Sequence, residues 1–292
     1  MEQLSERIAR IRDDHEHGSR WLVRSTIELL RDLATQSTLS PEEQLQELHQ
    51  AGRELAQVRP AMAALAGAVG RILAAPGGSA GMARSAEQLL QEYAQALARM
   101  TTFARPHLHG TIMIHSLSGT VLEVVSSCIP PVAHIILLEG RPLYEGRAAA
   151  QHLLQQPVQL TLITDAQAAI FLSRCHAVVV GADSILADGS ILNKAGTALL
   201  AWAARGQGVP FYVLAETLKI SPHPWSGDLS LLEEKSPQEV WSQPPSGVTV
   251  RNFYFDHTPA ELITEIISEK GPLSREQIQQ QAAKIQQQLG TF

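Results

Sequence analysis

The spacing of apolar residues changes partway along the chain. As far as residue 105, apolar residues recur every three or four positions, as at Leu22, Leu29 and Leu33, and runs of β-branched residues are scarce. This period is typical of amphipathic helices. We therefore expect a helical N-terminal domain over residues 1–105.

Helix boundaries in this part are marked by residues that favour caps and turns. Ser40 followed by Pro41 predicts a helix start, because a serine hydroxyl accepts a hydrogen bond from the first turn and proline fits the first helical position. A second break is expected before Pro60. The small residues of the stretch 75–81 predict a mobile loop between two helices.

From residue 106 onwards, short apolar runs alternate with amphipathic segments. The runs are 111–115, 135–138, 160–163, 177–180 and 211–214. Continuous apolarity predicts strands covered on both faces, and intervening helices such as 193–205 supply the crossovers. We expect an α/β fold with a Rossmann-like, doubly wound parallel sheet over residues 106–292. The remaining predicted elements are a strand over 250–255 and helices over 259–269 and 274–289.

Composition and charge exclude several classes of protein. Of 292 residues, 45% are hydrophobic and 18% are charged, which is ordinary for a globular chain. The net charge of −6, without any basic block, argues against direct nucleic-acid binding through phosphate neutralisation. No apolar run approaches the roughly 18 residues that a membrane span requires, and the charged N-terminus lacks an apolar leader segment. We expect a cytoplasmic protein that does not enter a membrane.

The residues that commonly bind metals do not form a convincing site. The chain has two cysteines, Cys128 and Cys175, which are too few and too far apart for a four-ligand zinc site, so we expect two buried thiols. Two close histidine pairs occur, His15 with His17 and His107 with His109. Side chains two positions apart on a helix point away from each other, which favours solvated histidines. We expect no metal and no other cofactor.

Familiar nucleotide and hydrolase motifs are also missing. The glycines at 206 and 208 precede an apolar run instead of following one and lack a third glycine, so the dinucleotide-binding fingerprint is absent. The chain contains no P-loop and no Gly-x-Ser-x-Gly sequence. These absences argue against a dehydrogenase, a P-loop nucleotide hydrolase and an ordinary α/β-hydrolase.

Chemically useful residues follow several of the predicted strands, where open parallel sheets bind their ligands. Residues 115–120 are small and hydroxylated and lead into a helix, whose first N–H groups either bind a phosphate or are simply capped. Asp183 follows a buried run, so burial would raise its pKa toward the range of acid–base catalysis; the alternative is a helix cap. Lys194 would pair with a phosphate or with Asp183. Glu216 and Lys219 add a carboxylate and a cation to the same rim.

In this order and spacing, these motifs resemble the superfamily of translation initiation factor 2B regulatory subunits, methylthioribose-1-phosphate isomerase and ribose-1,5-bisphosphate isomerase. The resemblance extends from about Asp13 to Gly271. The matching segments are 18–20, 59–60, 111–120, 139–142, 181–184, 193–197, 215–219 and 252–259.

The resemblance implies a sugar-phosphate pocket between a helical domain and a Rossmann-like domain, and dimerisation through the C-terminal part. The isomerases of the superfamily use a cysteine after the first strand together with the aspartate of the Gly-Ala-Asp motif, which correspond by position to Ser116 and Asp183. The implied phosphate and sugar contacts are Gly18, Ser19, Arg20, Arg59, Ser118, Gly119, Asn193, Lys194 and Lys219.

Ser116 is the main departure from the isomerase pattern. A thiol has a pKa of about 8.5 and yields a working base or thiolate, whereas a serine hydroxyl is weak without an activating partner. If Ser116 faces the pocket from an extended segment, its neighbour His115 faces elsewhere. We therefore expect a regulatory protein that binds a phosphorylated sugar or nucleotide and forms a homodimer or a higher homo-oligomer. The alternative is an active aldose-to-ketose phosphate isomerase.

Overall fold

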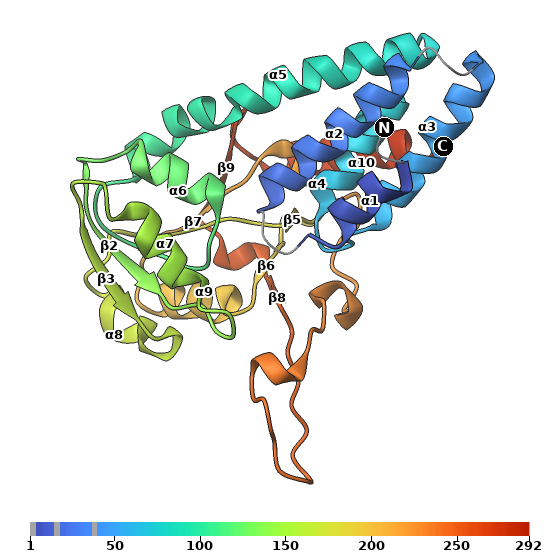
Figure 1. Ribbon diagram of the computed structural model, residues 1–292. Helices are drawn as coiled ribbons and strands as arrows, with labels where there is room; N and C mark the ends of the chain where they lie inside the picture. The colour runs from blue at the N-terminus through green and yellow to red at the C-terminus, as the bar shows by residue number, and fades with distance from the viewer. Residues whose placement is uncertain (1–3, 15–17, 37–39, 292) are drawn as a thin grey trace.

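The computed structural model describes residues 4–14, 18–36 and 40–291. The histidine pair at positions 15 and 17 lies outside these residues. The described chain combines a bundle of helices with an α/β part built around a central sheet (Figure 1).

Five helices make up the N-terminal bundle, as the apolar spacing predicts. They are α1 (Leu4–Arg12), α2 (Ser19–Thr35), α3 (Pro41–Gln57), α4 (Ala63–Leu73) and α5 (Gly78–Ala104). Their apolar stripes meet in one core that includes Leu22, Leu48 and Ile72. The predicted start at Ser40 is confirmed as a capping box, in which Ser40 Oγ accepts from the Glu43 N–H at 3.3 Å and the Glu43 carboxylate accepts from the Ser40 N–H at 2.9 Å.

The loop predicted over 75–81 is shorter than expected, because α5 already begins at Gly78. Gly77 has a φ of +96°, a conformation that favours glycine, and turns the chain between α4 and α5. A Cβ placed at Gly81 would lie 1.9 Å from the Pro76 carbonyl oxygen. These small residues therefore permit close backbone packing, and only a short turn separates the helices.

The predicted doubly wound sheet is confirmed. Its seven strands are β1 (Gly110–Ile114), β2 (Val132–Leu138), β3 (Gln159–Ile163), β4 (Ala177–Val180), β7 (Phe211–Leu214), β9 (Glu265–Ser268) and β10 (Gly271–Pro272). The spatial order is β10-β9-β7-β4-β1-β2-β3, and all neighbours are parallel except β9 and β10. Because the chain order reverses between β1 and β4, the topological switch point lies between these two strands.

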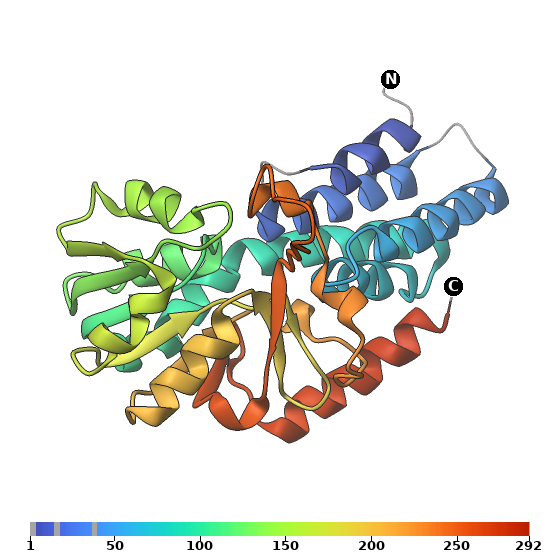
Figure 2. The same cartoon turned by 90° about the horizontal axis from the view of Figure 1, so that it is seen from below.

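Helices cover both faces of the sheet. One face packs on α8 (Ala168–Leu172), α9 (Thr197–Gly206) and α10 (Arg275–Leu289), and the other on α6 (Gly119–Ser126), α7 (Glu145–Leu153) and the end of α5. The strand β3 differs from the expectation of full coverage, since it lies at the sheet edge and leaves Leu162 44% exposed. Figure 2 shows α10 running alongside the helical bundle, where it packs against α4.

The structure contains a second, small sheet, and the C-terminal part departs from three predictions. The small sheet consists of β5 (Ser184–Ile185), β6 (Ile191–Lys194) and β8 (Phe255–Thr258), paired antiparallel. The helix expected over 193–205 begins only at Thr197, after Gly196 with a φ of +104°. The strand expected over 250–255 lies at Phe255–Thr258. The helix expected over 259–269 is wrong: the β-branched residues there form β9, which extends the main sheet beside β7.

Residues 221–254 form an extension that carries little regular structure. It contains two short 3₁₀ turns, Leu229–Leu232 and Pro237–Glu239, and projects from the body of the molecule as the orange segment in Figure 1. Its two arms meet where Glu234 bridges Phe253. The extension then returns to the body through Tyr254 and β8.

Two further expectations concern the cysteines and membrane-spanning helices. Cys128 is buried as expected. Cys175 is only partly buried, and this partial burial raises the pKa of its thiol to about 11. Within residues 4–14, 18–36 and 40–291, no helix combines the length and the apolar character needed to cross a membrane.

Candidate functional site

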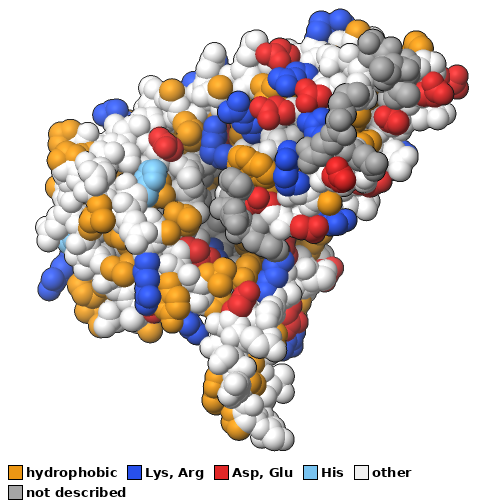
Figure 3. Space-filling view, in the orientation of Figure 1, with side chains coloured by type: hydrophobic (Ala, Val, Ile, Leu, Met, Phe, Trp, Pro, Cys, Tyr) orange, Lys and Arg blue, Asp and Glu red, His pale blue; other side chains and the backbone are white. Residues whose placement is uncertain are grey.

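The loops that follow β1 and β4 diverge at the switch point of the sheet, and the start of α2 faces them. Ser116 and Ser118 lie in the first loop, Asp183 lies in the second, and Ser19 and Arg20 come from α2. Figure 3 shows the surface hollowed between the α/β part and the helical bundle. We refer to this meeting point as the crevice.

Ser116 has an unusual backbone conformation for a residue with a side chain. Its φ is +68°, in the left-handed region that non-glycine residues seldom occupy. Its side chain makes no hydrogen bond to any described residue. The preceding His115 is 1% exposed and places Nε2 3.0 Å from the Ala195 carbonyl oxygen. Among the described residues, Ser116 therefore has no histidine or carboxylate hydrogen-bonded to its hydroxyl that would activate it.

Ser118 caps α6, as one of the alternatives for this loop predicts. Its hydroxyl accepts a hydrogen bond from the Val121 N–H at 3.3 Å, which leaves the N–H groups of the exposed Gly119 and the buried Thr120 without intrahelical partners in the first turn. Gly181 packs against this cap, since a Cβ there would lie 2.7 Å from Ser118 Oγ. The glycine of the Gly-Ala-Asp motif therefore provides the space in which Ser118 sits.

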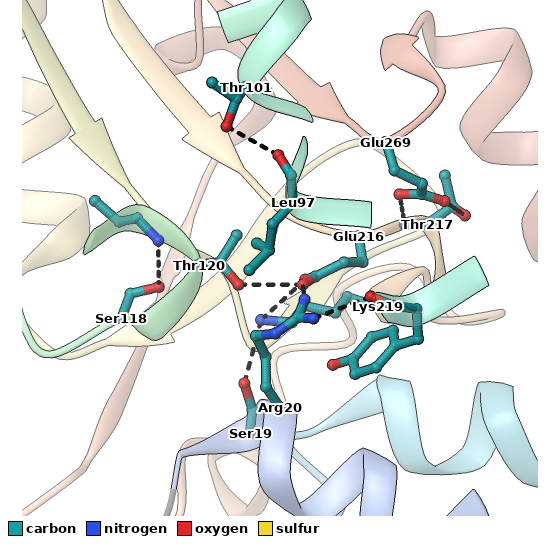
Figure 4. Close-up of polar contacts among 12 residues, drawn as sticks. Ser19, Arg20, Leu97, Thr101, Ser118, Thr120, Glu216, Thr217, Lys219 and Glu269 are labelled. Atoms are coloured by element: carbon teal, nitrogen blue, oxygen red, sulfur yellow. Dashed lines mark hydrogen bonds and ion pairs between the residues drawn. The ribbon is translucent and has the colours of Figure 1, made fainter. Parts of the chain in front are cut away.

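A buried carboxylate, Glu216, connects the helical bundle to the sheet edge (Figure 4). It follows β7, is 1% exposed, and forms an ion pair with Arg20 of α2. Thr120 Oγ1 also donates to its Oε1 at 3.2 Å. Burial alone would raise the pKa of Glu216, but the positive charges of Lys219 and Arg20 outweigh it and lower the pKa.

Lys219 is 3% exposed and reaches across the crevice. Its Nζ donates to the Ala182 carbonyl oxygen at 2.7 Å and to Ser19 Oγ at 3.4 Å, and it lies 3.8 Å from Glu216 Oε2. The structure thus brings together four of the predicted binding residues, from three separate parts of the chain. They are Ser19, Arg20, Ser118 and Lys219.

Asp183 lies beside this group and keeps part of its side chain in contact with solvent. Burial raises the pKa of its carboxyl, against the positive charges of Lys219 and Lys194, and the charge of Glu233 adds to the rise. The Asp183 side chain has no hydrogen-bond partner among the described residues. It is therefore available to a ligand, in agreement with its expected place in the crevice.

Lys194 pairs with Glu145, at 2.5 Å, and its pairing with Asp183 is not seen. Its Nζ also lies 4.7 Å from the centre of the Tyr254 ring, which returns from the extension. Asn193 is buried and donates through Nδ2 to Thr197 Oγ1 at 2.9 Å. Both residues end β6, and both already have partners inside the protein.

Two other predicted binding residues contribute no side-chain contact to this group. Gly18 is exposed and directly precedes Ser19 of α2, and a Cβ placed on it would have no described atom within 4 Å. Arg59 donates to the Asp14 carbonyl oxygen and lines a separate cavity of about 630 Å³ with Lys235 and Glu233. The charge of Glu233 also raises the pKa of Asp183.

The sequence did not reveal Glu145 or Tyr254 as parts of the site. Glu145 lies in a segment without a chemical motif, and Tyr254 lies in the matching segment 252–259, which gave it no role. Both reach Lys194 because α7 and the extension converge there. The nearby Asp165 fixes the loop after β2 by accepting from the N–H groups of Gly140 and Arg141 at 2.9 and 2.8 Å. In the part of the chain that the structure describes, no three His, Cys, Asp or Glu side chains form a group that could hold a metal.

Comparison with known proteins identifies close relatives over nearly the whole chain. The Initiation factor 2 subunit family matches residues 15–275. The chain is 31% identical over 287 residues to the ribose 1,5-bisphosphate isomerase of Archaeoglobus fulgidus, covering 94% of this chain and 91% of the relative. It is also 31% identical over 275 residues to a Pyrococcus horikoshii protein named putative translation initiation factor eIF-2B subunit 2-like, covering 92% and 96%.

The fold is shared as well. The crystal structure of translation initiation factor eIF-2B from Pyrococcus horikoshii matches this structure with a TM-score of 0.81 and 30% identity, covering 94% of this chain and 97% of that one. The extent of these matches agrees with the resemblance inferred from the motifs. The chain therefore belongs to the Initiation factor 2 subunit family.

Proposed function

We propose that the crevice binds a phosphorylated sugar or nucleotide and that the chain acts as a regulatory protein through this binding. Three features at one edge of the sheet support an anion site. They are the first turn of α6, the buried ammonium of Lys219 and the guanidinium of Arg20. Helix N-termini and arginine side chains are common phosphate ligands in proteins.

The charge balance of the crevice favours an anion when Asp183 is protonated. Arg20 and Lys219 share one carboxylate, Glu216, and Lys194 has its own partner in Glu145. A neutral Asp183 then leaves one positive charge uncompensated. Burial raises the pKa of Asp183 and so favours this neutral form.

The regulatory assignment rests on the environment of Ser116. Aldose-to-ketose isomerisation moves hydrogen between C1 and C2 and needs two groups that handle protons. By the resemblance, Ser116 corresponds in position to the thiol of the superfamily's isomerases, and no described side chain forms a hydrogen bond with its hydroxyl to activate it. His115 is directed to Ala195 instead.

The properties of Asp183 favour the second candidate, an active aldose-1-phosphate isomerase of the ribose-1,5-bisphosphate or methylthioribose-1-phosphate type. Its raised pKa suits a proton donor, and it lies free in the crevice. In this candidate Ser116 or a water molecule supplies the other proton-handling group. The relative from Archaeoglobus fulgidus is named for such an activity.

A thermal-shift panel followed by phosphorus NMR separates the two candidates. The panel contains ribose 1,5-bisphosphate, ribose 1-phosphate, methylthioribose 1-phosphate and nucleoside monophosphates. A bound ligand raises the melting temperature by mass action. A ligand that stabilises the protein and stays unchanged supports the regulatory assignment, and conversion to a ketose phosphate contradicts it. Failure of every compound to bind contradicts both candidates.

Two variants test the roles of Asp183 and Ser116. If conversion is seen, Asp183→Asn should lower turnover by roughly 10²-fold or more while ligand binding persists, since general acid–base catalysis contributes about that much. Full activity in this variant would remove Asp183 from the mechanism. If no conversion is seen, Ser116→Cys tests whether a thiol alone restores turnover. Assembly into a homodimer or a higher homo-oligomer remains a prediction.

A further inference from the structure

A cavity outside the crevice has Glu216 in its lining. It has a volume of about 800 Å³, and four elements enclose it: α4, α5, the turn after β9, and α10. Its size suits a small organic molecule. We refer to it as the rear cavity.

Positive side chains without carboxylate partners surround the rear cavity. Five cations line it, from α4, α5, the turn after β9 and α10: Arg71, Arg84, Arg99, Lys270 and Lys284. Arg71 forms a two-point ion pair with Glu92, at 2.6 and 2.9 Å. The other four form no ion pair with any carboxylate in the described ranges.

The carboxylates of the lining are already engaged. Glu92 pairs with Arg71, and Glu216 pairs with Arg20. Glu269 accepts hydrogen bonds from the N–H, at 2.9 Å, and the hydroxyl of Thr217. The unpaired charge around the cavity is therefore positive, which favours an anionic ligand such as a phosphate ester.

The floor of the rear cavity holds two buried polar atoms that lack hydrogen-bond partners among the described residues. Tyr93 is 6% exposed and its Oη has no hydrogen-bond partner; Glu216 is 1% exposed and its Oε2 has none either, although the Lys219 ammonium lies 3.8 Å from it. Buried polar groups are seldom left unsatisfied in proteins. A ligand hydroxyl can accept from the tyrosine and donate to the carboxylate.

From this combination we infer that the rear cavity is a second ligand site, which takes a phosphorylated, hydroxyl-bearing small molecule. The phosphate lies among Arg84, Lys270 and Lys284, and the hydroxyl groups reach Tyr93 and Glu216. The site is distinct from the crevice but shares a wall with it. Arg20, in the crevice, stacks on the Tyr93 ring at 4.3 Å and pairs with Glu216.

Methyl NMR of the full chain locates binding in this cavity directly. Ile285 lies in the lining, and Ile170 is an exposed reference on α8. The chain is labelled at isoleucine methyl groups, and the Ile285 signal is assigned with Ile285→Val. The probe is ribose 5-phosphate, with ribose and inorganic phosphate as comparators. We expect a saturable shift of Ile285, weaker binding of either comparator, and no shift of Ile170.

Paired variants identify the side chains responsible. Arg84→Ala with Lys284→Ala should weaken the probe roughly tenfold or more, the loss expected for charge-assisted hydrogen bonds. Arg53→Ala with Arg174→Ala removes the same charge at exposed positions outside the cavity and should leave the affinity unchanged. Lys194→Ala alters the crevice and should leave the Ile285 shift unchanged. Loss of binding in the crevice can therefore be distinguished from loss of binding in the rear cavity. An unmoved Ile285 signal at millimolar probe, or equal loss in both double variants, would overturn the inference.

Discussion

Arg20 and Glu216 form an ion pair across 196 positions of sequence and join the first turn of α2 to the end of β7. Arg20 also donates to the Tyr93 carbonyl oxygen at 3.0 Å, so the same side chain connects two helices of the bundle to the sheet edge. An ion pair with a buried carboxylate therefore joins the two parts of the chain that form the crevice and fixes their relative positions.

Replacing Glu216 should strongly destabilise the fold. Glu216→Gln leaves Arg20 and buried Lys219 without their counter-charge, and removing one partner of a buried ion pair costs about 3–5 kcal/mol. The partly exposed pair of Glu92 with Arg71 is the matched control, and Glu92→Gln should cost about 1 kcal/mol or less. Chemical denaturation measures the loss of unfolding free energy in each variant. A loss in Glu216→Gln as small as the one expected for Glu92→Gln would show that the Arg20–Glu216 pair is not structural.

The charge of Asp183 should set the pH dependence of anion binding. Its pKa is raised, so it ionises as the pH rises through that pKa, and the new negative charge opposes an anion in the crevice. Sulfate is a suitable probe because it does not itself titrate near neutral pH. We expect the affinity for sulfate to fall by about tenfold across this transition, which corresponds to a change of about one unit in the pKa of Asp183 when sulfate binds. Asp183→Asn should abolish the fall. Calorimetric titration across the pH range provides the measurement, and an identical profile in the variant would argue against this role.

A single methyl group at Gly181 should disturb the crevice. The added Cβ of Gly181→Ala would lie 2.7 Å from Ser118 Oγ and 3.3 Å from Ser118 Cβ, so the cap of α6 must move. We expect ligand affinity to fall roughly tenfold, equivalent to about 1.4 kcal/mol. Gly206→Ala is the control, because Gly206 is exposed and has open space around it. Unchanged affinity in Gly181→Ala would mean that the Ser118 cap does not shape the site.

Asp256 should make stability decrease with rising pH. It accepts from the N–H groups of Gly196 and Ala198 at the start of α9, yet burial raises its pKa to about 6. The folded state then binds a proton that the unfolded state, with an aspartate pKa of about 3.9, has released. Between pH 4 and pH 6 the wild-type chain should lose up to about 3 kcal/mol of unfolding free energy relative to Asp256→Asn. Denaturant unfolding across this range measures the loss, and parallel curves would contradict the raised pKa.

Much of the fold follows from local patterns that the sequence displays. The apolar runs ending at Ile114 and Val180 form the two central strands of the switch point, because continuous apolarity requires cover on both faces. The segment containing Ile266 and Ile267 was predicted as a helix and is a strand. Its β-branched residues favour a strand and were the available signal in the sequence. Pairing with β7 makes the segment a strand instead of a helix.

Other parts of the site depend on contacts between distant segments and have no local signature. Lys194 was expected at a helix start beside Asp183, but β6 carries it to Glu145 of α7. Tyr93 has the sequence context of an ordinary core residue of α5, and only the fold places it beneath Arg20. The positive φ of Ser116 is likewise invisible in sequence, since serine has no preference for that conformation.

Calorimetric titration of the best ligand from the panel into wild type and Lys219→Met tests whether the crevice binds a phosphorylated sugar or nucleotide. Methionine fills the buried space of Lys219 without its charge, and circular dichroism checks that the variant is folded. We expect saturable binding to wild type and a loss of roughly tenfold or more in the variant. Equal affinity in a folded Lys219→Met chain would contradict binding in the crevice, as would the absence of binding by every phosphorylated compound.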